Sequence, residues 1–201
     1  MLSNWKNTAM NSLLWISENS QAKFSLKENE HLSILSFNSE CRISVELCGE
    51  GAAFEYRSLS VCGTEQTIRV MHKAPCTRSF LFARHILSDN SKAVFNGIIE
   101  AGKHCANISS RQLVNSILLC PGAKVISKPE LKIYCDDVEC SHGSTCGGLD
   151  EDSLFFLQSR GVDLPQAEKL LLSAFAAEVA KEHPNAEQRR EFNRRFHSPD
   201  C

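Results

Sequence analysis

The sequence has no long apolar run. Its longest early run, Leu13–Ile16, is far shorter than the roughly 20 residues that a membrane-spanning helix needs. The first twenty residues contain Lys6 but no extended apolar stretch, so they lack the pattern of a signal peptide. We therefore expect a soluble protein of the cytoplasm.

The sequence also lacks a large net charge of one sign. It likewise lacks the phosphate-binding and nucleophile loop motifs of common enzymes. Its formal net charge is −2, and basic residues gather only at Arg189-Arg190 and Arg194-Arg195. Nucleic acid is therefore not the expected partner, because phosphate binding needs a concentrated positive face. No glycine-rich phosphate loop and no serine nucleophile elbow occurs, which disfavours a hydrolase or transferase. We expect a protein that is not an enzyme.

Cysteine, in contrast, is abundant. No CxxC pair occurs, so a zinc ribbon is disfavoured, and a chain of 201 residues without a secretory signal is the wrong context for a disulfide framework. Outside residues 135–146 we interpret most cysteines as small, buried, apolar-like residues. The ten are Cys41, Cys48, Cys62, Cys76, Cys105, Cys120, Cys135, Cys140, Cys146 and Cys201.

Short strands follow one another from about Lys23 to Cys146, with no helical stretch between them. The segment Cys41–Cys48 alternates apolar and polar residues, as a half-buried strand does. A turn is expected at Lys128-Pro129. Such a run indicates a sandwich, a barrel or a β-solenoid, and no strict repeat chooses among them. The other expected strands are 31–37, 53–61, 67–72, 79–87, 92–100, 116–119, 124–127 and 131–140.

Three helices are predicted after Gly147-Gly148, with N-caps at Asp150, Asp163 and Asn185. They would span 150–160, 163 to about 183, and 186–197. The second should carry one apolar stripe, made of Ala167, Leu170, Leu171, Ala174, Phe175 and Val179. The chain is thus expected to have an N-terminal lead-in (1–22), a β core (23–148) and a helical C-terminal module (149–201).

The segment Leu131–Gly148 carries the residues best suited to chemistry. In a strand, Cys140 and His142 share one face, Cys146 has the same parity, and Cys135 lies on the other face. Thiolate and imidazole are ligands that suit iron in clusters, or zinc. An iron–sulfur cluster usually takes four ligands, so any remaining ligands must come from a second chain or from small molecules.

Two other interpretations of this segment stay open. A catalytic Cys–His pair is disfavoured, because Asp136, Asp137 and Glu139 would raise the pKa of a nearby thiol. The plainer interpretation is a hydrogen-bonded His142 in a polar turn beside two core cysteines. Histidines scattered through the β core, such as His104, are likewise expected to be satisfied polar residues.

Four ordered segments resemble the SufB/SufD family of the SUF iron–sulfur cluster assembly system. Asp89–Gly97 resembles the family's central signature, and Pro129–Thr145 resembles the SufD-type signature that follows it. Leu149–Gly161 and Leu171–Glu178 continue the likeness in the same order. The Cys-Ser-His-Gly sequence within the second segment favours the SufD type over the SufB type.

The resemblance implies a mainly β protein, a right-handed parallel β-helix followed by a small helical module. It implies pairing with a SufB-like subunit, with a SufC-like ATPase carried on the C-terminal helices. The nascent iron–sulfur cluster would lie transiently at the SufB–SufD interface, with His142 as a ligand and Cys140 beside it. The family's N-terminal helical region is not found in this sequence. Cys135 and Cys146 replace a small and an aliphatic residue; they are extra thiols, and we favour a core-filling role.

The resemblance places the SufC docking surface between Asp150 and about Phe196. ATP-driven closing of two SufC subunits would then pull on these helices and shift the interface that holds the cluster. The alternatives are a stand-alone metal-binding β-protein and an inert partner-binding module. The expected docking residues are Leu154, Phe155, Arg160, Phe175 and Glu178.

Overall fold

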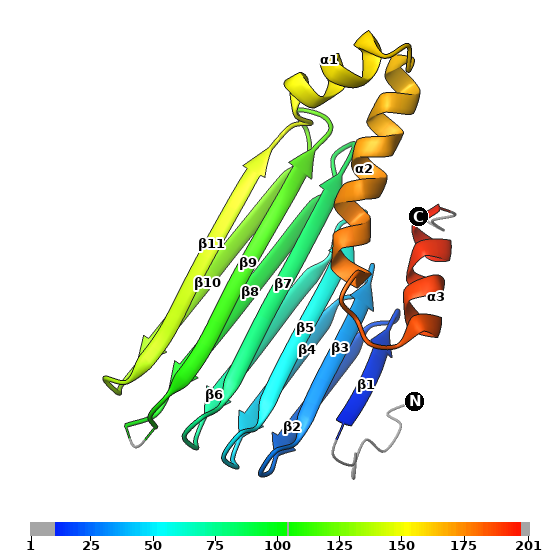
Figure 1. Ribbon diagram of the computed structural model, residues 1–201. Coiled ribbons are helices and arrows are strands. Elements are labelled where there is room, and N and C mark those ends of the chain that lie inside the picture. Colours follow the sequence, from blue (N-terminus) through cyan, green and yellow to red (C-terminus); the bar gives the residue numbers. More distant parts are fainter. Residues whose placement is uncertain (1–10, 104, 198–201) are drawn as a thin grey trace.

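The computed structural model describes residues 11–103 and 105–197, and it shows a parallel β-helix of two sheets followed by three helices (Figure 1). Sheet A has the order β1-β3-β5-β7-β9-β11 and sheet B the order β10-β8-β6-β4-β2. All neighbouring strands are parallel. The mainly β class and the β-helix are therefore confirmed. The strands are β1 (Asn11–Ile16), β2 (Ser20–Leu26), β3 (His31–Phe37), β4 (Cys41–Leu47), β5 (Ala53–Ser60), β6 (Glu65–His72), β7 (Arg78–Leu87), β8 (Lys92–Ala101), β9 (Ile108–Leu118), β10 (Lys124–Ile133) and β11 (Val138–Gly147).

The apolar core lies between the two sheets. Every second residue of β4 is buried, which confirms the predicted alternation. Because the strands pair in register, equivalent residues stack in columns that run from strand to strand. One column of sheet A joins Ile34, Tyr56 and Leu81, all fully buried. Burial of each such side chain contributes about 1.5–3 kcal/mol, so the stacked columns hold the β-helix together.

Several strands differ from the sequence-based prediction. Two strands, β1 and β2, begin before Lys23, and β9 is longer than the predicted 116–119. The predicted turn at Lys128-Pro129 is wrong, because Pro129 lies within β10 opposite Gly97. Strand β10 is the edge of sheet B, where a residue without an N–H can be accommodated. The predicted strand 131–140 is the end of β10 and the start of β11.

The three C-terminal helices are α1 (Glu151–Ser159), α2 (Leu164–Ala180) and α3 (Ala186–His197). Their predicted N-caps are confirmed. The side chains of Asp150 and Asp163 each accept a hydrogen bond of 2.9 Å from the backbone N–H three residues later. Asn185 accepts bonds of 2.9 and 3.0 Å from the first turn of α3. No helix in the described part of the chain is both long and apolar enough to cross a membrane.

Helix α2 runs along the outer face of sheet A, and α3 follows it (Figure 1). Val179 and Phe192 pack there against apolar residues of β3, β5 and β7. The predicted stripe of α2 is partly wrong, since Leu170 is 52% exposed and Ala174 is also exposed. Ala167 is buried in the first turn, and the other buried residues, Ala176, Val179 and Ala180, lie in the last two turns, where the helix packs against sheet A. The first turns of α2 instead contact α1.

Most cysteines outside residues 135–146 are not core residues, which corrects the prediction. Only Cys41 and Cys105 are buried among those that the structure describes. Cys48 is exposed, while Cys76 and Cys120 are half-buried. All three lie in the connections between sheets, and of them Cys120 packs against the edge of a small buried cluster formed by Leu87, Ala93 and Ala123. Cys201 lies outside the described residues, as does His104.

Candidate functional site

The last strand, β11, carries the candidate ligands at one end of the β-helix (Figure 1). It pairs with β9 on one side and is the edge strand of sheet A. The register runs through Gly143 without a break, and it places Cys140, His142 and Cys146 beside Ser110, Gln112 and Ser116. These three β9 residues are buried in the interior. The β11 side chains of the same parity therefore continue the interior columns to their open end.

Exposure along β11 reflects this terminal position. Cys140 is half-buried, whereas His142 and Cys146 are exposed. Strand β9 covers one side of each residue, and no described strand covers the other. A core-filling role is therefore wrong for Cys146. Cys135 is half-buried in the connection between β10 and β11.

The pKa values of the Cys140 and Cys135 thiols are raised, which favours their protonated form. Burial raises the pKa of Cys140, the nearby Cys135 raises it further, and a backbone hydrogen bond from Ser110 opposes the shift. Burial also raises the pKa of Cys135, with added repulsion from Cys105 and the two aspartates that follow. A raised pKa makes a poor nucleophile, and a metal ion that binds such a thiol must displace its proton.

A chain of hydrogen bonds lies behind Cys140. Ser110 and Ser79 are joined at 2.6 Å, and Ser79 lies 3.0 Å from Nε2 of His72. The other ring nitrogen of His72 lies 2.8 Å from the Thr77 hydroxyl. Burial lowers the pKa of His72 to about 4, so its ring is neutral at physiological pH. The interior is therefore polar where it meets the end of the β-helix.

Gln112 of β9 is the register partner of His142 of β11, and its side chain is fully buried. Its Nε2 donates to the carbonyl of Gly97 at 3.5 Å, and its Oε1 has no partner among the described residues. A Cβ atom on Gly97 would lie 2.1 Å from that Oε1, so this position of β8 admits only glycine without rearrangement. Gln112 is not among the candidate residues predicted from the sequence. A glycine inside a strand was the one available signal, because it often marks a close approach.

His85 and Ser116 lie behind Cys146. The Nδ1 atom of His85 is 3.1 Å from the Ser116 hydroxyl, and its Nε2 has no partner among the described residues. Burial lowers the pKa of His85 to about 4, so this ring is also neutral. Each of the three β11 candidates thus has a polar side chain behind it.

The candidate ligands do not form a complete metal site. In residues 11–103 and 105–197, no three His, Cys, Asp or Glu side chains are arranged to hold a metal ion. Cys140 and His142 lie on one face, but the coordination sphere around them is open. Any metal centre at this position needs ligands from outside the described chain.

The predicted docking residues of α1 lie on an exposed surface. Leu154 is half-buried, Phe155 is 74% exposed, and the guanidinium of Arg160 lies 5.3 Å from the Phe156 ring. Phe156 is 57% exposed and is not among the docking residues predicted from the sequence. With Leu164 and Leu170 of α2, also exposed, these aromatic residues form what we call the elbow surface (Phe155, Phe156, Leu164 and Leu170).

The predicted docking residues of α2 lie apart from this surface. Phe175 packs under the guanidinium of Arg84, 4.2 Å from its ring, and Arg84 also donates to the Phe175 carbonyl. Glu178 is exposed and pairs with Lys181 at 3.2 Å. Phe175 thus fixes the helix to sheet A, whereas Glu178 is exposed to a partner together with its ion-pair partner Lys181.

Comparison with known proteins identifies relatives of this chain. Residues 7–175 match the family described as "SUF system FeS cluster assembly, SufBD core domain". Over 144 residues the chain is 35% identical to the iron–sulfur cluster assembly protein SufD of Escherichia coli K12, covering 69% of this chain and 34% of that protein. It is 36% identical over 152 residues to the chloroplastic protein ABCI7 of Arabidopsis thaliana, covering 73% and 32%. Bacillus subtilis SufD is 29% identical over 147 residues, covering 70% and 33%. The chain therefore spans about a third of the length of these relatives.

Proposed function

This chain belongs to the SufBD core domain family of the SUF system for iron–sulfur cluster assembly, and on that basis we propose that it is a non-catalytic scaffold subunit of the SUF complex. It would work in the cytoplasm, pair with a SufB-like subunit and dock a SufC-like ATPase. The nascent cluster is the cargo of this complex. In this proposal His142 supplies one ligand to the cluster at the interface between the two scaffold subunits.

One observation carries the proposal: Cys140 and His142 continue the interior columns at the uncovered end of the β-helix. The same end presents the outer edges of β10 and β11, the last strands of the two sheets. Unpaired strand edges are ready templates for strands of another chain. A second β-helix that docks here would cover the half-buried Cys140 and the exposed His142 and add its own ligands.

The ligand chemistry suits a cluster that must be passed on. An imidazole ligand such as His142 would bind iron without adding a negative charge, whereas a thiolate would bind more tightly. Cys140, whose thiol has a raised pKa, lies two residues before His142 on the same face of β11. Cys135 and Cys146 are further candidate thiols. We propose that this mixed, incomplete set of ligands favours transfer over storage.

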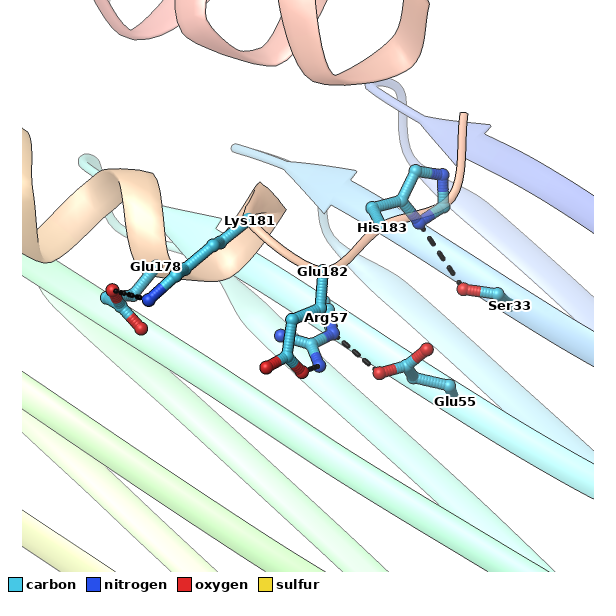
Figure 2. A network of polar contacts seen from close by, with 7 residues as sticks. All are labelled: Ser33, Glu55, Arg57, Glu178, Lys181, Glu182 and His183. Carbon is cyan, nitrogen blue, oxygen red and sulfur yellow. Dashed lines mark hydrogen bonds and ion pairs between the residues drawn. The ribbon is translucent and has the colours of Figure 1, made fainter. Parts of the chain in front are cut away.

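The helices are proposed to connect the ATPase with the scaffold. The elbow surface offers exposed apolar side chains for docking, next to Leu154 and Arg160. At the other end of α2, Arg57 of β5 pairs with Glu182 at 2.8 Å and with Glu55 at 2.6 Å (Figure 2). A pull on α1 and α2 would therefore act on sheet A, and a two-state shift of this kind could open the interface.

The test uses the intact complex. We would co-express the chain with the SufB-like and SufC-like proteins of its host, and compare His142→Ala with Ser144→Ala. Ser144 is the matched control, because it is exposed on the same face of the same strand. Cluster yield, measured as iron and sulfide per complex, should fall for His142→Ala alone. Undiminished yield in a complex that assembles normally would remove His142 from the mechanism.

Metal analysis of the isolated chain, together with co-purification of the complex, separates the alternative functions. A stand-alone metal-binding protein would bind zinc or iron stoichiometrically as an isolated chain, and binding would depend on Cys140, His142 and Cys146. An inert partner-binding module would co-purify with the ATPase, but no variant of β11 would change cluster yield. The incomplete ligand set of the described residues favours the shared site over the stand-alone one.

A further inference from the structure

A groove on the outer face of sheet A lies apart from the His142 site. Its volume is about 650 Å³, and it is closed on one side by Pro184 in the connection between α2 and α3. The outward side chains of β3, β5, β7 and β9 form its floor. His142, in contrast, belongs to the interior columns. The residues on which the argument depends are His31, Ser33, Glu55, Arg78, Phe80 and Arg111.

The groove carries an excess of positive charge. Its carboxylate, Glu55, is already paired with the buried Arg57, which also holds Glu182 (Figure 2). Arg78 and Arg111 form no ion pair with any residue that the structure describes. Both are exposed, and both line the groove. Two guanidinium groups in the groove are therefore left without a counter-charge from the described residues.

The strand register brings these two arginines close together. Arg78 of β7 is opposite Ser109 of β9, and Arg111 lies two residues further along β9 on the same face. Like charges at diagonal positions of neighbouring strands repel each other. An oxyanion between them would remove this repulsion, since the planar guanidinium fork binds phosphate and carboxylate through paired hydrogen bonds. Ser33 and Ser109 add hydroxyl groups to the same groove.

Part of the groove wall is apolar. Phe80 lies between Glu55 and Arg111 in the register, and its ring stacks on Phe82 with centroids 5.9 Å apart. Leu13 and Pro184 add apolar surface. The volume falls within the roughly 300–1,000 Å³ range of small-ligand sites. A charged end beside an apolar wall is the usual arrangement for an amphiphilic small molecule.

We propose that this groove binds a small organic anion with a flat apolar body, held by Arg78 and Arg111 at its oxyanion and by Phe80 along its body. A phosphate ester and a carboxylate share this chemistry. Residues 1–10, which precede the groove-lining Ser12, contain Lys6 and neither Asp nor Glu, so their charge does not match the groove. Ser33 lies 3.4 Å from Nδ1 of His183, so the ligand would be next to the connection between α2 and α3.

The test titrates the full chain with 1-naphthyl phosphate, 1-naphthoate and uncharged 1-naphthol, by calorimetry at low and at physiological salt. At least one of the two anions should bind much more tightly than naphthol. The anion with the higher affinity identifies the ligand class, a phosphate ester or a carboxylate. Arg78→Gln and Arg111→Gln should each weaken binding about tenfold. Arg42→Gln is the control, because it removes the same charge from an exposed arginine of sheet B, away from the groove.

Three results would overturn the proposal. The proposal is wrong if neither anion binds more tightly than naphthol. It is also wrong if Arg42→Gln weakens binding as much as the two groove variants do, or if binding is seen only after residues 1–10 are removed. Circular dichroism of each variant checks that the fold is kept. Phe80→Leu should weaken binding of the naphthyl compounds while leaving inorganic phosphate unchanged, which separates stacking from charge.

Discussion

Gln112 lies directly behind His142 in the register of β9 and β11, and its buried Oε1 has no hydrogen-bond partner among the described residues. A buried acceptor without a donor costs about 1–3 kcal/mol, so a nearby N–H is strongly favoured to reach it. The imidazole of His142 carries such a group. A metal-binding histidine usually donates its second ring N–H to a fixed acceptor, which sets the tautomer and the ring orientation.

The first prediction follows from this pair. The two side chains are not hydrogen-bonded in the structure, and we propose that His142 donates to this Oε1 once a cluster binds. Gln112→Met keeps the volume of the side chain and removes the acceptor, so the bound His142 ring would lose its orientation. Cluster yield in the SUF complex should fall roughly tenfold, and the ¹⁵N shifts of His142 should show a changed tautomer ratio. Gln66→Met is the control, because Gln66 is also buried but bonds to Ser58 and to the Ser39 carbonyl. Equal loss in both variants would indicate a general loss of stability instead.

The second prediction concerns Gly97, which faces Gln112 across the interior. The new Cβ of Gly97→Ala would lie 2.1 Å from Oε1 and 2.6 Å from Cδ of Gln112. Overpacking of this kind costs about 1–3 kcal/mol, which urea unfolding can measure. Gly148→Ala, where no atom lies within 4 Å of the added Cβ, should change little. The double variant Gly97→Ala/Gln112→Ala should recover part of the loss, and strict additivity would rule out the contact.

The third prediction concerns acid stability. Burial lowers the pKa of both His72 and His85 to about 4, below the roughly 6.5 of an unfolded histidine. Their contribution to stability is thus fully present above about pH 6.5 and is lost as the pH falls towards 4. Between about pH 7.5 and pH 5, the free energy of unfolding should drop by about 2 kcal/mol per histidine. His72→Gln should flatten this dependence, and an unchanged slope would contradict the assignment.

Local signals in the sequence were enough to predict the helices and the general fold class. The three N-caps depend on residues within one turn, so Asp150, Asp163 and Asn185 could be identified from the sequence alone. The position of Pro129 within a strand could not be predicted, because a proline is tolerated in a strand mainly where that strand is at the edge of its sheet. That property depends on the order of strands in the sheet.

The same limit applies to the candidate site and the groove. The shared parity of Cys140 and His142 follows from the two-residue period of a strand. Gln112 could not be connected to His142, because the column joins positions 34, 56, 81, 112 and 142, and these steps are unequal. An unequal spacing hides the repeat from the sequence. The approach of Arg78 and Arg111 depends on the same register and was equally hidden.

The last prediction tests the elbow surface. Phe155 is 74% exposed, so Phe155→Ser should change the free energy of unfolding by no more than about 0.5 kcal/mol. An exposed aromatic side chain that anchors a partner contributes far more to association, and its loss costs about 2 kcal/mol or more, which is over tenfold in affinity. Binding of the SufC-like ATPase, measured by biolayer interferometry, should therefore weaken at least tenfold while the melting temperature stays constant. Tyr134→Ser supplies the control, since Tyr134 is 55% exposed but lies between β10 and β11, at the opposite end of the strands from α1. If Phe155→Ser leaves ATPase binding unchanged, docking through the elbow surface is wrong, and the exposed side of α2 near Glu178 becomes the surface to test.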